Sequence, residues 1–258
     1  AWRATTKFLK ETLEKDKRFA VAVSSHLKAG DKGGDVPTAP FPPDLSKYQV
    51  AISNYNGAPW PEDFRAAFAK LVSDGKLGFV LFHSANNGFA NWPEFNRMVG
   101  LAWRGAAFGD RLYVDEAGKT VRLPKGEGSN TGETNDPYSV VIRNADHPIS
   151  KGMPREWMHG KDQLMHNLRG PAEDVNILAT SLCPKTKVHE PILFTIAYGK
   201  GRIVQTPMGH DVFAMRCVGF MTTMQRALEW VATGNVTTSI PPNFPSAEKA
   251  SHLPEPKK

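Results

Sequence analysis

The stretch Gly78–Phe95, GFVLFHSANNGFANWPEF, decides the fold because it opens as a continuous apolar run and then turns polar. GFVLFH has the length and composition of a strand that is buried on both faces, as in a parallel sheet. A histidine, a serine and two asparagines then follow. In an open α/β sheet, ligands bind outside the carboxyl ends of the strands, so this polar run predicts the rim of a pocket.

Strands and helices alternate on the N-terminal side of this stretch. We expect a helix over 5–16, a strand over 19–25 (FAVAVSS) and a strand over 48–54 (YQVAISN), followed by a helix over 61–75 that closes at Gly75. This alternation predicts βαβ units and a layered α/β fold. Such folds usually open on a strand, whereas this chain opens on a helix, so we expect that a first strand is missing.

The C-terminal half is richer in strands. We expect a hairpin over 111–123, strands over 138–144 and 175–181, and a pair of strands over 191–211 that leads into a helix over 212–233. One apolar stripe on that helix indicates core packing and no chemical role for its members, which are Cys217, Met221, Met224, Leu228 and Val231. We expect a single domain over 1–240 and an extended or disordered Pro-rich tail over 241–258.

The composition of the chain is typical of a globular domain. A chain of 258 residues with 40% apolar and 22% charged residues fits one globular domain. The net charge of +6 is scattered and forms no basic stripe with aromatic residues, which argues against nucleic-acid binding. The apolar runs are too short for a membrane span, and no signal-peptide pattern opens the chain. The two cysteines, Cys183 and Cys217, are too isolated for a Cys-x-x-Cys site, so we expect them to be buried apolar residues.

Polar residues gather after four of the expected strands, the first of which is followed by Ser24, Ser25 and His26. Asn54 follows the strand over 48–54, His83 opens the run that includes Asn86 and Asn87, and MGHD at 208–211 follows the last strand. The positive end of the next helix favours the neutral form of His210, as a base or a metal ligand. Structural roles compete with these: a hydrogen-bonded core histidine at 83, Asx turns at 86 and 87, and an N-cap at Asp211.

Other polar residues give weaker signals. Glu190 stands beside the buried run PILF, where it could act on a ligand or form a rim salt bridge. His159, Asp162 and His166 would share one face of a helix, as a metal or sugar site or as a solvated face. The sequence does not fit two catalytic chemistries. Neither cysteine lies on the tight strand-to-helix turn that a glutaminase requires, and Ser84 is not in the G-x-S-x-G motif of a serine hydrolase.

Four segments resemble one known family. They are FHSANNGFANWPEFNRMVGLAW, HPISKGMPREWMHGKDQLMHNLRGP, EPILFTIAYGKGRIVQTPMGHD and GFMTTMQRALEWVATGNVT, and they resemble the trehalose-utilisation (ThuA-like) family from about Trp2 to Pro245. The resemblance implies a class I glutamine amidotransferase-like fold: a flavodoxin-like three-layer sandwich with a mainly parallel central sheet, plus a C-terminal β-hairpin and helix. It also implies that the amidotransferase cysteine is absent.

The chain departs from the family pattern in three places. The family's opening strand and its T-G-x-N-N-H-x-W motif are represented only by Trp2. The central loop reads GSNTGETND where members tend to carry a His-Gly pair, and Asp162 begins DQLM where members often read D-E-L-Y. The residues carried over by motif position are His83, Asn86, Asn87, Trp92, Glu94, Glu190, His210 and Asp211.

The resemblance implies a role in sugar catabolism, on 3-keto glycosides of trehalose type that a partner sugar dehydrogenase would make. A keto group acidifies the neighbouring C–H, so a general base, with hydrogen-bond donors or a divalent metal such as zinc to hold the enolate, would suffice for elimination or isomerisation. We assign His83, His210, Asp211 and Glu190 to catalysis, with His83 and His210 as the metal candidates. The expected substrate-binding residues are Asn86, Asn87, Trp92 as a stacking surface, Glu94, Asn54 and His159.

Two alternatives stand beside this enzyme. The absent loop histidine and Gln163 favour a non-catalytic carbohydrate-binding module on the same fold. The other alternative is a hydrolase or amidotransferase-type enzyme with a different nucleophile. The family's export signals favour a periplasmic or secreted location over a cytoplasmic one.

Overall fold

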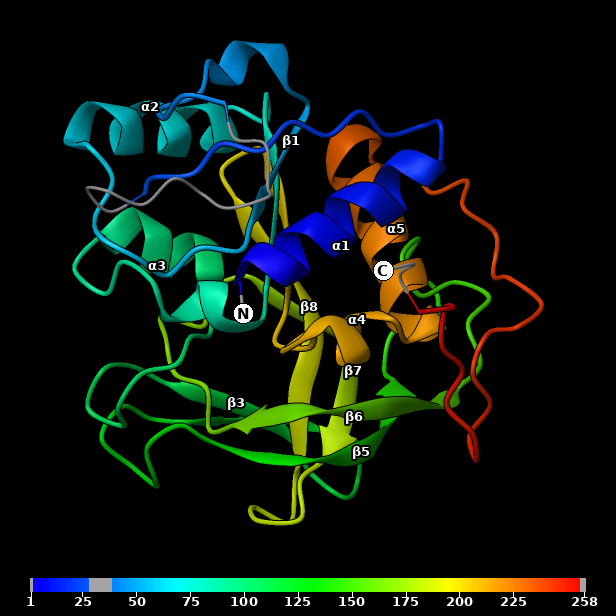
Figure 1. The fold of residues 1–258 in the computed structure, drawn as a ribbon. Helices are drawn as coiled ribbons and strands as arrows, with labels where there is room; N and C mark the ends of the chain where they lie inside the picture. The colour runs from blue at the N-terminus through cyan, green and yellow to red at the C-terminus, as the bar shows by residue number, and fades with distance from the viewer. Residues whose placement is uncertain (1, 28–38, 256–258) are drawn as a thin grey trace.

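The computed structural model describes residues 2–27 and 39–255, and they form an α/β fold around one curled, mixed sheet (Figure 1). The order of strands in the sheet is β1-β2-β9-β8-β7-β5-β6, with β3 paired to β8 and β4 paired to β3. The strands are β1 Val50–Ser53, β2 Gly78–Phe82, β3 Arg111–Val114, β4 Thr120–Leu123, β5 Gly132–Ile142, β6 Glu156–His166, β7 Val175–Leu182, β8 His189–Tyr198 and β9 Gly201–Thr206.

The pairing of these strands corrects the expected mainly parallel sheet. Only β1 with β2 and β2 with β9 pair in parallel, whereas β9 with β8, β8 with β7, β7 with β5 and β5 with β6 are antiparallel. The tight turn between β8 and β9 forces the change of direction, because a two-residue connection can join only antiparallel neighbours. The parallel part is confined to one end of the sheet.

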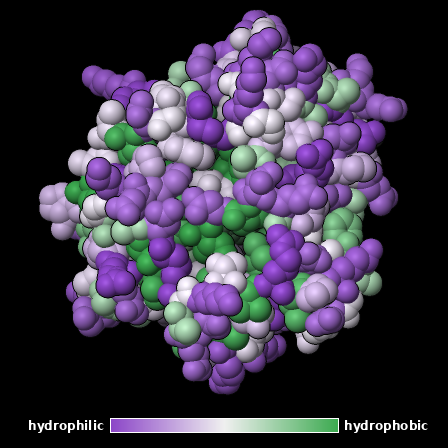
Figure 2. All heavy atoms as spheres, turned by 180° about the vertical axis from the view of Figure 1, so that it is seen from behind, coloured by the Kyte–Doolittle hydropathy of each residue, from purple (hydrophilic) through white to green (hydrophobic). Residues whose placement is uncertain are grey.

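Helices cover both faces of this parallel part. They are α1 Trp2–Lys15, α2 Glu62–Ser73, α3 Pro93–Val99, α4 Val212–Met215 and α5 Val218–Thr233, with short 3₁₀ turns η1 Leu45–Lys47 and η2 His83–Asn87. One buried apolar cluster joins α1 and α5 to the sheet, and a second joins α2 and α3 to the opposite face. Seen from behind, the surface is mainly hydrophilic, with apolar residues in a central hollow (Figure 2).

Several expected elements are confirmed. The hairpin over 111–123 is β3 with β4, and the helix over 61–75 is α2, which ends before Gly75 at φ +74°. The stripe on α5 is core, because Cys217, Met221 and Met224 are buried. Both cysteines are free and buried, as expected.

Three expected elements differ. Residues 19–25 form no ladder strand and make one isolated bridge, Ser24 with Ala39. The helix over 212–233 is broken into α4 and α5 between Met215 and Val218. His159, Asp162 and His166 lie on β6 and not on a helix, because HGKDQLMH pairs antiparallel with β5.

The tail over 241–255 packs on the domain without regular structure. The amide of Met158 donates to the carbonyl of Ser246, and the amide of Leu253 donates to the carbonyl of Arg216. Phe244 contacts Trp157 edge to face. These contacts cover the outer edge of β6 and the break between α4 and α5. None of the helices within the described ranges is both long and apolar enough to span a membrane.

Candidate functional site

Two histidines meet at the carboxyl ends of the neighbouring strands β2 and β9. His83 is the first residue after β2, and His210 lies four residues after the end of β9. Their rings stand nearly perpendicular, and His83 Nε2 lies 3.0 Å from His210 Nδ1. Parallel pairing of β2 with β9 brings these strand ends together, as the rule for open α/β sheets requires.

The hydrogen bonds of the pair fix which nitrogens carry protons when both rings are neutral. His83 Nδ1 lies 3.2 Å from the carbonyl oxygen of Pro207, which can only accept, so Nδ1 carries the proton. His83 Nε2 is then the acceptor, and His210 Nδ1–H donates to it. This leaves a lone pair on Nε2 of His210, which accepts no hydrogen bond from any residue the structure describes.

The backbone of the two loops that carry this pair has positive φ at His83 and at Gly209. His83 adopts φ +46°, a conformation that a residue with a Cβ avoids, and Gly209 adopts φ +99°. Strain of this kind persists only where the surroundings over-determine it, and it clusters at functional sites. A glycine fits position 209, because an added Cβ there would lie 2.9 Å from the Phe220 ring.

Asp162 on β6 holds the loop that carries His210. Its Oδ2 accepts from the Gly209 amide at 2.7 Å, and its Oδ1 accepts from the His210 amide at 3.0 Å. The same Oδ2 lies 2.9 Å from Nε2 of His159, which is fully buried. This buried carboxylate therefore fixes the backbone of His210 from the neighbouring antiparallel part of the sheet.

Burial and the Asp162 charge set the protonation of the surrounding histidines. Burial lowers the pKa of His83, although the charge of Asp162 partly opposes this, so His83 is neutral near pH 7. Burial alone would also lower the pKa of His159, but its hydrogen bond to Asp162 and its interaction with Cys217 outweigh burial and raise that pKa. The pKa of Asp162 is lowered, because His159 and two backbone amides outweigh the effect of burial.

Two further residues of the predicted site lie at the same rim in supporting positions. Asp211 caps α4, since its Oδ1 accepts from the Ala214 amide at 2.8 Å. Asn54 follows β1 and donates to the hydroxyls of Thr5 and Thr6 at 2.9 Å each, which ties the first turn of α1 to this rim.

The remaining residues of the run after β2 turn away from the pair. Asn86 is fully buried and accepts from the Trp103 amide at 3.2 Å, while Asn87 is exposed and its carbonyl accepts from Arg104. Trp92 is 4% exposed and packs among aromatic rings, so a sugar finds no open ring face there in this structure. Glu94 is exposed in the first turn of α3.

Glu190 belongs to a separate buried cluster. Its Oε1 pairs with Arg111 and accepts from the Thr186 hydroxyl, and its Oε2 accepts from the Asn167 amide at 3.2 Å. No hydrogen bond in the described part of the chain links it to His83 or His210. These contacts give Glu190 a structural position, apart from the histidine pair.

The histidine pair does not by itself fit a zinc site. Catalytic zinc takes three protein ligands in most enzymes, and within residues 2–27 and 39–255 no group of three His, Cys, Asp or Glu side chains is arranged to hold a metal. Asp162 is already bonded to two amides and to His159. The structure thus places the metal candidates His83 and His210 together, and the residues it describes supply no third ligand.

The sequence predicts that His83 and His210 share one rim but does not indicate the residue that positions the His210 backbone. Asp162 was grouped with His159 and His166 as a helix face, and its link to residue 210 spans 48 positions. The available signal is strand alternation, which puts Asp162 on the same face of β6 as Gly160 and the buried Leu164, and a buried carboxylate requires partners.

Comparison with known proteins identifies relatives of this architecture. The family model described as "Trehalose utilisation" (ThuA) matches residues 1–231. A ThuA-like protein from Parabacteroides merdae ATCC 43184 is 35% identical, with a TM-score of 0.86 over 98% of this chain and 92% of that chain. A ThuA-like protein from Bacteroides uniformis ATCC 8492 is 19% identical, with a TM-score of 0.55 over 90% of this chain and 89% of that chain, and shares the fold.

A search of curated proteins found no match. The family match spans most of the chain, and it includes both histidines of the pair and the Asp162 that holds the His210 loop. The chain therefore belongs to the trehalose-utilisation (ThuA) family.

Proposed function

We propose that this protein acts in carbohydrate catabolism on keto-glycosides of trehalose type, by general acid/base chemistry at His83 and His210. The family supports a carbohydrate-related role. The observation that carries the proposed chemistry is the hydrogen-bonded pair at 3.0 Å, which leaves Nε2 of His210 as an open proton acceptor. A partly exposed imidazole beside a buried, neutral one is suited to proton transfer near pH 7.

The proposed reaction is an elimination from a 3-keto glycoside. Nε2 of His210 takes the proton from the carbon between the keto group and the anomeric carbon, and the electron pair forms an enolate. The enolate then expels the glycosidic oxygen, the C–O bond breaks, and the histidinium returns its proton to that oxygen. His83 shares the positive charge through its Nε2, and the nearby Asp162 carboxylate stabilises it.

The substrate sets the place of the protein in a reaction sequence. A 3-keto glycoside is an oxidised sugar, so a sugar dehydrogenase must act before this protein. The step itself consumes no oxidant and no reductant, because one C–H and one C–O bond break while one C=C and one O–H bond form.

The test is the turnover of 3-keto-trehalose by the wild type, His210→Ala and the double variant His83→Ala/His210→Ala. We expect a loss of about 100-fold or more in kcat/KM in both variants, the usual worth of a positioned acid/base group. The matched control is His147→Ala, because His147 is also half-buried but packs on Trp230 at the other end of α5. Unchanged turnover in the double variant would refute the assignment.

A non-catalytic carbohydrate-binding module is the second candidate. It is favoured by the central loop over 128–136, which lacks the family's His-Gly pair, and by the burial of His83, which is 7% exposed. Calorimetry of 3-keto-trehalose binding, combined with an assay for released glucose, separates the two functions. Binding without release would favour the module, and release that depends on His210 would favour the enzyme.

A further inference from the structure

A cysteine, a histidine and an aspartate form one buried series of polar side chains behind the rim. Nε2 of His159 lies 2.9 Å from Oδ2 of Asp162, and the same imidazole interacts with the thiol of Cys217. Cys217 and His159 are fully buried, and Asp162 is 2% exposed. Thiol, imidazole and carboxylate in this order are the parts of an activated cysteine nucleophile, in which the histidine takes the proton of the thiol.

One ring nitrogen of the histidine lacks a well-formed hydrogen bond. Nδ1 of His159 is buried and has no hydrogen-bond partner of regular geometry among the described residues. Because Nε2 faces Asp162, Nδ1 is the nitrogen that remains for the thiol of Cys217. A buried polar atom without a partner is costly, and a thiolate would supply an acceptor for a protonated Nδ1. The burial of this nitrogen therefore favours the ionised form of the pair.

The backbone around Cys217 also favours a negative charge on sulfur. Cys217 is the N-cap of α5, a helix of 16 residues, and the positive end of a helix stabilises a thiolate. The amides of Phe220 and Gly160 act on the thiol in the same sense. Burial raises the pKa of Cys217, but His159 and these amides outweigh burial, so that pKa is lowered.

Two other titratable groups face this site. The ring of Tyr138 lies 5.1 Å from that of His159, and burial raises the pKa of Tyr138 well above its ordinary value, so its hydroxyl stays neutral. Burial and nearby cations lower the pKa of His252, which is therefore neutral above its ordinary range. The charge of the site near pH 7 is thus set by Asp162, His159 and Cys217.

A short piece of the C-terminal tail covers the thiol. This end of the chain, drawn in red, runs beside α4 and α5 (Figure 1). Cys217 and His252 form an isolated antiparallel bridge, and the Val218 amide donates to the Ser251 carbonyl at 2.8 Å. The ring of His252 fits over Gly160, where an added Cβ would lie 2.4 Å from its Nε2. The cover therefore lies directly over the site.

Arg216 fixes the next residue of this cover. The Leu253 amide donates to the Arg216 carbonyl at 2.7 Å, and Nε and Nη2 of Arg216 donate to the Leu253 carbonyl at 2.9 and 2.8 Å. Nη1 of the same side chain contacts the exposed Glu255 at 3.2 Å. One arginine thus supplies much of what holds the tail over 251–255 in place.

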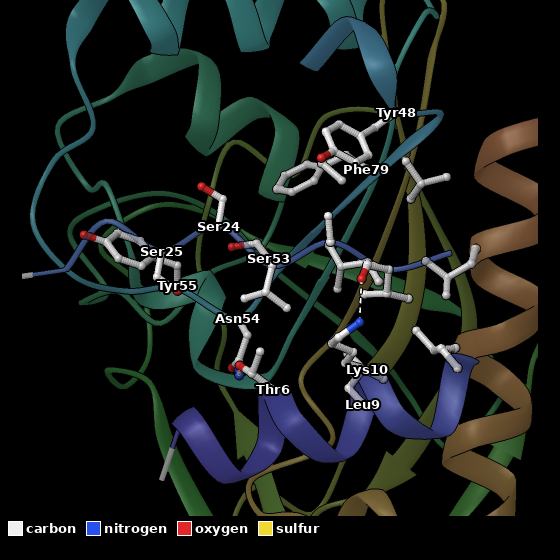
Figure 3. A pocket seen from close by; sticks show the side chains of 18 of the residues that line it. Thr6, Leu9, Lys10, Ser24, Ser25, Tyr48, Ser53, Asn54, Tyr55 and Phe79 are labelled. Carbon is white, nitrogen blue, oxygen red and sulfur yellow. Dashed lines mark hydrogen bonds between the residues drawn. The ribbon is translucent and has the colours of Figure 1, made fainter. Parts of the chain in front are cut away.

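The groove of about 980 Å³ beside β1 does not reach this thiol. Thr6 and Leu9 of α1 lie along that groove (Figure 3), whereas Cys217 and His159 are not among the described residues that line it. Because residue 252 bridges to Cys217, movement of the tail over 251–255 is what would expose the sulfur.

We propose that Cys217 is a covered nucleophilic thiol, activated by His159 and Asp162 and exposed when the tail over 251–255 moves away, and that it adds to small conjugated carbonyl compounds. The thiolate forms a bond to the β-carbon of the C=C–C=O group, and the π pair moves to the α-carbon. The proton held by His159 passes to that carbon. One S–H bond and one C=C π bond are replaced by one C–S and one C–H bond, so no oxidant or reductant is needed.

This class of compound fits the pair because the addition uses both the thiolate and the proton. Neither His83 nor His210 takes part in it. The inference therefore stands independently of the sugar chemistry proposed above.

The first test follows the labelling of the two cysteines by N-ethylmaleimide, a conjugated carbonyl compound, with mass spectrometry of the proteolytic peptides. Arg216→Met removes the side-chain contacts to the tail and keeps an apolar stem. Cys183 is the internal control, because it is also free and fully buried. We expect Arg216→Met to speed the labelling of Cys217 at least about tenfold over the wild type and to leave Cys183 within about twofold.

Leu253→Pro loosens the same cover from the other side, because it removes the amide that donates to Arg216. It should also raise the labelling of Cys217 alone. An unchanged rate at Cys217 in both variants would show that the tail is not the cover. An equal rise at Cys217 and Cys183 in both variants would show general unfolding, and either result would overturn the proposal.

The second test measures activation by His159 through the pH dependence of labelling in the Arg216→Met protein. An ordinary thiol with a pKa near 8.5 loses about tenfold in reactivity per pH unit below that value. We expect the rate at Cys217 to change by less than about threefold between pH 6 and pH 8, and the additional change His159→Gln to restore the ordinary slope. An ordinary slope already in Arg216→Met would refute the activated thiol.

Discussion

The buried polar clusters around Glu190 and around Asp162 differ in whether one of their polar atoms remains available to a ligand. In the Glu190 cluster, both carboxylate oxygens are bonded to fixed partners and the side chain is 1% exposed. At the rim, Asp162 is equally saturated, but the contacts that it supports end on His210, which is partly exposed and whose Nε2 bonds to no described residue. A polar network becomes a candidate for catalysis where one of its atoms remains available to a ligand.

Asp162→Asn should have the largest effect on turnover and on stability, because it removes the charge that holds both the His210 loop and His159. We expect a fall in keto-glycoside turnover of about 100-fold and a loss of stability of about 3–5 kcal/mol, since the buried His159 would lose its charged partner. Turnover assays and urea unfolding measure the two effects. A variant with wild-type turnover would show that the loop needs no such anchor.

Glu190→Gln should affect stability alone. It leaves the Arg111 guanidinium buried beside a neutral amide, which costs about 3–5 kcal/mol. The turnover of the folded fraction should stay within about twofold of the wild type, because no contact among the described residues joins this cluster to the histidine pair. Restoration of stability by Arg111→Met in the same chain would confirm a closed ion pair, while a large loss of turnover would move Glu190 into the site.

The pH dependence of stability should reveal the Asp162–His159 pair. The pKa of His159 rises from its ordinary 6.5 to about 9 in the folded protein, so its contribution is complete below pH 6.5 and is lost as pH rises through about 9. Stability should fall by about 1.4 kcal/mol per pH unit across that window. Urea unfolding at pH 6, 7.5 and 9 gives the slope, and His159→Gln should abolish this contribution to it.

Trp92→Phe should have the smallest effect. Trp92 packs among Phe89, Phe95 and Trp60, and a smaller ring in that place costs about 1–2 kcal/mol of stability. Because its ring is covered, the affinity for a sugar should not change by more than about twofold. An affinity loss above tenfold would restore Trp92 to the substrate site.

Local signals predicted the parts of the fold that depend on local physics. The cap at Asp211, the buried stripe on α5 and the delivery of His83 by an apolar strand all follow from spacings of a few residues. Strands alternate with helices in the first part of the chain, and this alternation predicts a mainly parallel sheet. The antiparallel order of the later strands depends on pairings between distant segments. The contact of Asp162 with the His210 loop is not predictable from local signals for the same reason, since only the paired sheet brings β6 to the loop after β9.

The most direct test of the central claim is proton exchange at the carbon that the proposed base attacks. 3-Keto-trehalose is incubated with the protein in D₂O, and the NMR signal of the C–H between the keto and anomeric carbons is followed for the wild type and His210→Ala. If His210 is the base, we expect loss of this signal with the wild type, at a rate at least about 100-fold above that with His210→Ala. An equal rate with both proteins, or no loss with the wild type, would contradict it.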